Sequence, residues 1–182
     1  MKYLSTKNLV SKLSNIKYGY YDNVNKKIIT KDNELYFNDL FISKQCIVLK
    51  PKDFIKIQCG TNFDINFFIA NELNTNKYDT KLISYLYIKG ISDNKVTHYT
   101  TCIAKSKITN MYYWIDSPIE KYSTISSGMC NYNNIKNKIF HSFISRYGNI
   151  NFINENISWH NFYNYDPLTI STFIQICTQV HK

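Results

Sequence analysis

Three residues in the middle of the chain have the types that nucleophilic catalysis needs: Cys59, His98 and Asp116. A cysteine thiolate attacks a carbonyl carbon, a histidine takes the thiol proton, and a carboxylate fixes the tautomer and orientation of that histidine. Cys59 precedes His98 by 39 residues, and His98 precedes Asp116 by 18. The first interval has room for one helix and one strand, and the second has room for one hairpin.

These side chains can meet only if the right elements carry them. Residues 60–73, GTNFDINFFIANEL, are apolar over most of a helix's circumference, which predicts a buried central helix with Cys59 at its head. His98 opens an apolar strand, and Asp116 closes the next one. Adjacent antiparallel strands lie about 5 Å apart, so the two ends share one sheet edge. A helix end and an imidazolium at that edge would lower the pKa of the thiol from about 8.5.

The pattern around this centre predicts an α+β fold, with a small antiparallel sheet packed on the helix that bears the cysteine. The expected strands, separated by polar loops, cover residues 81–89, 98–104 and 111–115. A shorter strand is expected around Ile28 to Thr30. We expect one domain over 1–182.

Helices are expected at four further places. Apolar residues from Leu9 to Ile16 lie on one helical face, with Gly19 as the stop, and a short helical turn follows Pro51. Residues 131–147 predict an amphipathic helix. Asp166 and Pro167 have the types of an N-cap and a first helical residue, so a last helix is expected to run through Val180, with a strand as the alternative because of its β-branched content.

Composition sets further bounds. Hydrophobic residues make up 44% of the chain, which is typical of a globular protein. The net charge of +9 suits an anionic partner such as an acidic protein or peptide substrate, but it comes mostly from scattered lysines, so nucleic acid is not the expected partner. Five cysteines without C-x-x-C or zinc-ligand spacing predict a reducing, cytoplasmic compartment and no metal. No apolar segment approaches the roughly 20 residues that span a bilayer, and the start of the chain has no signal-peptide pattern.

Several segments together resemble the transglutaminase-like cysteine hydrolases, a papain-like superfamily. They are QCGTNFDINFFIANEL, KLISYLYIKG, HYTTCIA and YYWIDSP, preceded by NIKYGYYD and LKPKDFIKI. The resemblance covers roughly residues 8–118 and leaves 119–182 as a C-terminal helical extension. It implies that Cys59 is the nucleophile, His98 the base and Asp116 the third member of a catalytic triad.

The activity implied by this resemblance is that of a thiol protease or amidase, which cleaves an amide bond of a protein or peptide through a thioester. The backbone N–H of Cys59 would hold the oxyanion, with Gln45 or Gln58 as the second donor. No cofactor is implied. Whether water or an amine resolves the thioester stays open, as does the oligomeric state.

Other interpretations compete with this one. The fold can persist without catalysis, as a binding or assembly module. His98-Tyr99-Thr100 matches the H-x-T box of two-histidine phosphoesterases, but His141-Ser142-Phe143 does not supply the second copy. The segment HYTTC…YYWIDS is similar to the histidine box of ubiquitin-specific proteases, but no cysteine box lies upstream. The abundance of tyrosine and lysine suits single-stranded nucleic acid, without any RNP-like pattern beside it.

Overall fold

The computed structural model describes residues 6–30, 46–73, 77–88, 96–115, 131–147 and 152–157, with Thr169 and Thr172. Helices and antiparallel strands are mixed within these residues, so the fold is α+β, as the sequence predicts. The elements, in chain order, are α1 (Thr6–Leu13), β1 (Lys17–Asp22), β2 (Lys27–Thr30), β3 (Cys46–Ile47), α3 (Pro51–Ile57), β4 (Cys59–Gly60), α4 (Asn62–Leu73), β5 (Tyr78–Ile88), β6 (Val96–Ser106), β7 (Tyr112–Ile115), α5 (Tyr132–Tyr147) and β8 (Phe152–Ile157).

The larger sheet has the order β7-β6-β5-β8, and each neighbouring pair is antiparallel. Its first three strands form the predicted meander, although β5 and β6 begin earlier than their sequence pattern indicated. β5 and β6 pair along their whole length, from Tyr78 opposite Ser106 to Ile88 opposite Val96. β7 is much shorter and pairs only with the part of β6 from Cys102 to Lys105. The rest of that edge of β6 is therefore left to other partners.

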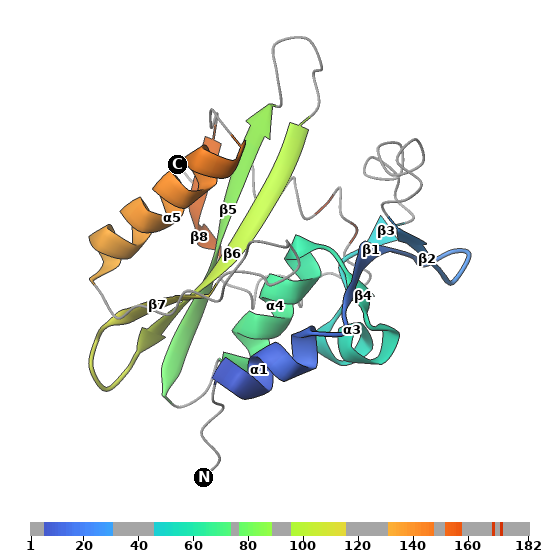
Figure 1. The fold of residues 1–182 in the computed structure, drawn as a ribbon, viewed down its shortest axis with the longest axis horizontal. Helices are drawn as coiled ribbons and strands as arrows, with labels where there is room; N and C mark the ends of the chain where they lie inside the picture. Colours follow the sequence, from blue (N-terminus) through green and yellow to red (C-terminus); the bar gives the residue numbers. More distant parts are fainter. Residues whose placement is uncertain are drawn as a thin grey trace.

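Helices α4 and α5 lie on opposite faces of this sheet (Figure 1). The alternation of the strands explains how both faces are buried. Leu82 and Cys102 belong to the core cluster that α4 fills with Phe67 and Phe68. Ile83, one position further along β5, instead belongs to the face that α5 covers, where buried side chains come from β5, β6 and α5. They are Ile83, Ile103, Ile135 and Ile139.

A second, smaller sheet forms beside α3. β1 lies between β2 and β3 as an antiparallel neighbour of each, and it also pairs with β4 in parallel. The predicted short strand near Ile28 is confirmed as β2. Gly19 was expected to end the first helix, and that prediction is wrong. Helix α1 ends at Leu13, and Gly19 lies inside β1.

Gly19 is needed where the backbones of β1 and β2 approach closely. A Cβ at Gly19 would lie 2.6 Å from the carbonyl oxygen of Ile29 and 3.1 Å from Sγ of Cys59. Glycine inside a strand often marks such a close approach. In the sequence alone, the same glycine indicated the end of a helix.

The C-terminal part of the chain gives a mixed outcome. Helix α5 confirms the helix predicted over 131–147, and Pro51 begins α3 as predicted. The predicted extension is not purely helical, because β8 joins the larger sheet beside β5. The helix expected from Asp166 to Val180 lies outside the described residues. None of the described helices is long and apolar enough to cross a membrane.

Candidate functional site

The site proposed from sequence depends on the N-terminus of α4, which begins three residues after Cys59, at Asn62. Thr61 caps the helix: its hydroxyl oxygen accepts a hydrogen bond from the Phe63 N–H at 3.2 Å. The Asp64 carboxylate accepts in return from the Thr61 N–H at 2.6 Å and from the Thr61 hydroxyl at 2.8 Å. This reciprocal arrangement is a capping box, and it fixes the residue at which the helix starts.

Asp64 has a second role in the core. Its other carboxylate oxygen accepts a hydrogen bond from the Leu49 N–H at 2.6 Å, so one side chain ties the segment before α3 to the head of α4. The carboxylate is fully enclosed, and burial raises its pKa from the ordinary 3.8 to about 6, against the opposing effect of the hydrogen bonds from Thr61 and Leu49.

Cys59 is therefore not at the head of the helix but in strand β4, opposite Lys17 of β1. Its side chain is fully buried, and its Sγ would lie 3.1 Å from a Cβ added at Gly19. Burial raises the pKa of the Cys59 thiol to about 11, with a smaller upward contribution from the charge of Asp64. The predicted lowering of this pKa is wrong for the described structure, because the loss of solvation outweighs the nearby Lys17 charge.

The N-terminus of α4 does meet the strand that carries the histidine. The Thr100 N–H donates to Oδ1 of Asn62 at 2.5 Å, and Nδ2 of Asn66 donates to the Thr100 carbonyl at 2.7 Å. These two amide side chains hydrogen-bond the N–H and the carbonyl of Thr100, which lies outside the part of β6 that pairs with β7. His98 lies on β6 two residues before Thr100, opposite Leu86 in the register. A strand rises about 3.3 Å per residue, so its Cα lies about 6.6 Å from that of Thr100.

Asn62 is the residue at the head of α4 whose side chain contacts the strand of His98. It is the first residue of α4, it is partly exposed, and its side chain contacts β6 at Thr100, two residues after His98. Asn66 lies one turn further into the helix and is fully buried. Its Nδ2 donates to two carbonyls, of Asn62 and of Thr100, which fixes the orientation of the amide. Oδ1 of Asn66 is a buried acceptor to which no group in the described part of the chain donates.

The other predicted site residues are placed less fully. Asp116 and Gln45 lie outside the described residues, and the description of His98 is limited to its backbone. Gln58, the second oxyanion candidate, ends α3 with a left-handed backbone (φ 54°), and its N–H donates to the Phe54 carbonyl. That N–H is committed within α3, and the Gln58 side chain is exposed.

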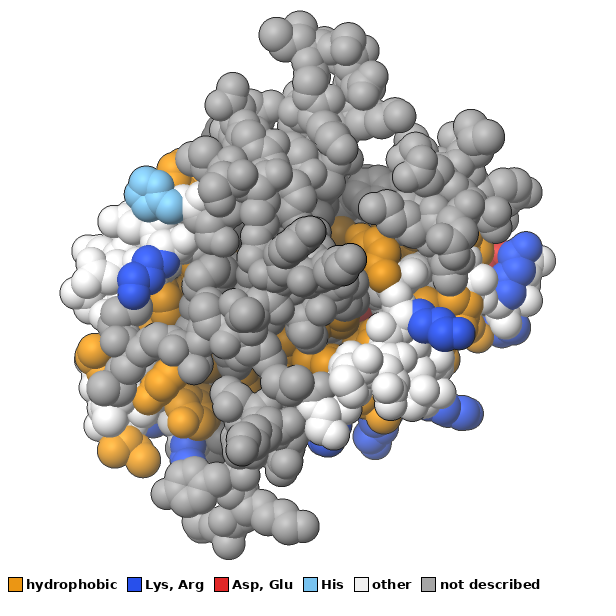
Figure 2. Space-filling view, viewed as in Figure 1, with side chains coloured by type: hydrophobic (Ala, Val, Ile, Leu, Met, Phe, Trp, Pro, Cys, Tyr) orange, Lys and Arg blue, Asp and Glu red, His pale blue; other side chains and the backbone are white. Residues whose placement is uncertain are grey.

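Metal and disulfide chemistry find no support in the part of the chain that the structure describes. The cysteines placed there, Cys46, Cys59 and Cys102, are buried thiols. No group of three or more potential metal ligands forms among the described residues. Lysine side chains lie at several separate places on the face shown in Figure 2, over α5 as well as over the β1–β2 side.

The sequence contains a pattern that indicates the true start of the central helix, although it was not used in the prediction. Thr61 and Asp64 have capping-box spacing, with Asp in place of the usual Glu, and this spacing puts the start of the helix at Asn62. Buried asparagines such as Asn66 have no comparable signature, because only the neighbouring strand gives them partners. In comparisons with known proteins, no family model, no curated protein and no solved structure matches the chain.

Proposed function

We propose that this chain is a non-catalytic domain with a transglutaminase-like arrangement of helix and strands, and that it acts by binding. The observation that carries the proposal is the hydrogen bond between Asn62 and Thr100, because it sets a carboxamide, and not the Cys59 thiol, at the contact between the head of α4 and β6. A carboxamide is a poor nucleophile and supplies no proton to a histidine base.

The state of Cys59 supports the same proposal. A thiol must form a thiolate and reach the substrate carbonyl before it can attack. With its pKa raised to about 11, the Cys59 thiol stays protonated at pH 7. Its side chain is also enclosed between β4 and β1, with no exposed surface. Formation of the thiolate and contact with a substrate carbonyl would both require a rearrangement of this part of the core.

The second candidate is the cysteine hydrolase with Cys59, His98 and Asp116. It is favoured by the contact between the head of α4 and β6, because such enzymes need a helix end beside the histidine strand. In that mechanism the Cys59 thiolate would attack an amide carbonyl and form a thioester. The leaving amine would take its proton from His98. The hydrolase requires the Cys59 thiol to lie next to His98, whereas a binding domain does not.

Alkylation of the native protein by iodoacetamide separates the two candidates. Cysteine modification would be followed by peptide mass spectrometry between pH 6 and 10, with the guanidinium-unfolded chain as the reference for full reactivity. We expect Cys59 to be protected at pH 7 to the same degree as Cys46 and Cys102, which are also fully buried. Selective and rapid modification of Cys59 at pH 7 would instead establish an activated thiol and refute the proposal.

A further inference from the structure

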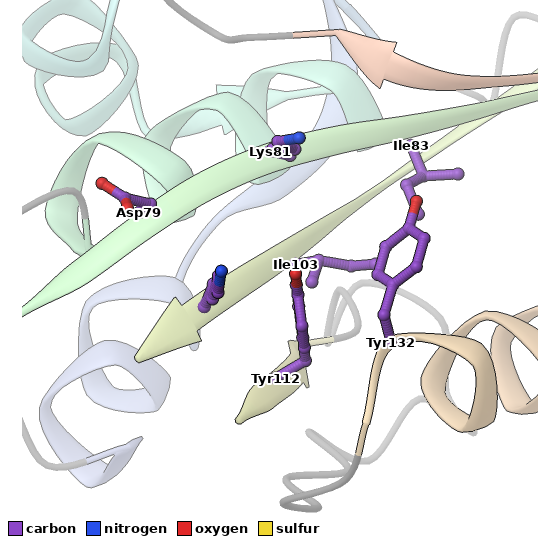
Figure 3. A pocket seen from close by; sticks show the side chains of 7 residues that line it. Asp79, Lys81, Ile83, Ile103, Tyr112 and Tyr132 are labelled. Carbon is purple, nitrogen blue, oxygen red and sulfur yellow. The ribbon is translucent and has the colours of Figure 1, made fainter. Parts of the chain in front are cut away.

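A groove lies on the face of the larger sheet that α5 covers, away from the contact between α4 and β6 (Figure 3). Its volume is about 290 Å³, at the lower end of the range for small-molecule sites. Its residues come from β5, β6, β7 and the first turn of α5. A groove of this size accommodates one small ring system better than an extended chain.

The floor of the groove is apolar and its walls are aromatic. Ile83 and Ile103 lie at the base, each almost fully buried. Tyr112 and Tyr132 form one wall, with ring centroids 5.1 Å apart and planes inclined by 51°. Both rings lean over the isoleucines in Figure 3. Flat apolar groups pack well on such a surface, because aromatic side chains offer large rigid faces.

The rim of the groove is cationic. Lys81 and Lys105 line it from neighbouring strands, and no acidic side chain in the described part of the chain pairs with either. Asp79 also lines it, but Nζ of Lys107 lies 3.0 Å from its carboxylate and offsets the charge. Nζ of Lys105 lies 5.7 Å from the centre of the Tyr112 ring, which holds the cation beside the aromatic wall.

We propose that this groove binds a small aromatic anion, with the flat body against Tyr112 and Ile103 and the anionic group between Lys81 and Lys105. The charge of the rim selects the anion, and the apolar floor selects the ring system. The inference gives the binding role proposed above a ligand class, and it rests on that role. It does not depend on Asn62 or Cys59, so alkylation and ligand binding can fail separately.

The probe for this site is 1-anilinonaphthalene-8-sulfonate, whose fluorescence rises when its rings leave water. We expect one molecule to bind per native chain. We also expect 1-naphthoate to displace it at a concentration at least tenfold lower than 1-naphthamide, which has the same rings without the charge. Lys81→Gln and Lys105→Gln should each weaken binding of the probe by roughly tenfold, because each removes one of the two cations.

Lys52→Gln is the matched control, because Lys52 is an exposed lysine on α3 and does not line the groove. It should leave the affinity unchanged, and circular dichroism melting should show that all three variants remain folded. Equal displacement by the amide and the acid would overturn the proposal. So would wild-type affinity in both groove variants, or an equal loss of affinity in Lys52→Gln.

Discussion

Replacement of Asp64 by alanine tests the capping box that fixes the start of α4. The carboxylate accepts from the Leu49 N–H, the Thr61 N–H and the Thr61 hydroxyl, all of them buried. A buried donor left without its acceptor costs about 1–3 kcal/mol. Partial relaxation of three such donors gives an expected loss of about 3–5 kcal/mol in the free energy of unfolding when Asp64 is protonated.

The cost should depend on pH in a direction set by the raised pKa of Asp64. The folded chain keeps this proton up to about pH 6, whereas the unfolded chain releases it near pH 3.8. The stabilisation from Asp64 is therefore complete below pH 3.8 and is lost as the pH rises through about 6. A shift of this size corresponds to about 3 kcal/mol. The cost of Asp64→Ala should thus be about 3 kcal/mol smaller at pH 8 than at pH 3.5.

Urea unfolding followed by circular dichroism at several pH values measures this difference directly, because all other titrating groups are common to both proteins. Asp53→Ala is the control, since Asp53 is an exposed carboxylate in the first turn of α3. It should change stability by no more than about 0.5 kcal/mol. A cost of Asp64→Ala that grows with pH, or one below about 1 kcal/mol at pH 3.5, would refute the reasoning.

Three further substitutions probe the region around Cys59. Gly19→Ala should cost about 2–3 kcal/mol, because the new Cβ would lie 2.6 Å from the Ile29 carbonyl oxygen; thermal melting would show it, and an unchanged melting temperature would contradict the close approach. Cys59→Ala should cost about 1–2 kcal/mol in urea unfolding, since it removes a fully buried sulfur; a neutral outcome would indicate that the site is open. Gln58→Gly should raise stability by about 0.5–1 kcal/mol, because Gln58 has a left-handed backbone; destabilisation in the same assay would argue against that conformation.

The sequence predicted the architecture better than the start of the central helix. Long apolar strands and the buried helix were recognisable because their side chains repeat with the periods of the structures they form. The expected start of the helix at residue 60 was two residues early, because Gly60 belongs to β4 and Thr61 caps the helix. That small difference moves Cys59 from a helix terminus into the core.

The raised pKa of the Cys59 thiol could not be predicted from the sequence for a different reason. A helix terminus lowers a thiol pKa only where the thiol lies at that terminus, and burial acts in the opposite direction. Burial of Cys59 depends on Gly19 in β1 and on the pairing of β1 with β4. β1 was not predicted as a strand, so neither the position of Gly19 beside Cys59 nor the pairing of β1 with β4 could be predicted.

The most direct test of the central claim asks which residue lies beside the histidine strand. Asn62→Cys places a thiol at the first residue of α4, where the native side chain accepts from the Thr100 N–H. Lys52→Cys is the matched control, because it places an exposed thiol in the first turn of α3, far along the chain from His98. The rate of iodoacetamide alkylation as a function of pH gives the pKa of each introduced thiol.

We predict that the thiol introduced by Asn62→Cys has a pKa below about 8.5 and that His98→Ala raises it again. The thiol introduced by Lys52→Cys should react at the rate of an ordinary exposed thiol, with or without His98. Cys59 should remain protected in every variant. The account is contradicted if Asn62→Cys reacts no faster than Lys52→Cys while Cys59 is modified rapidly at pH 7.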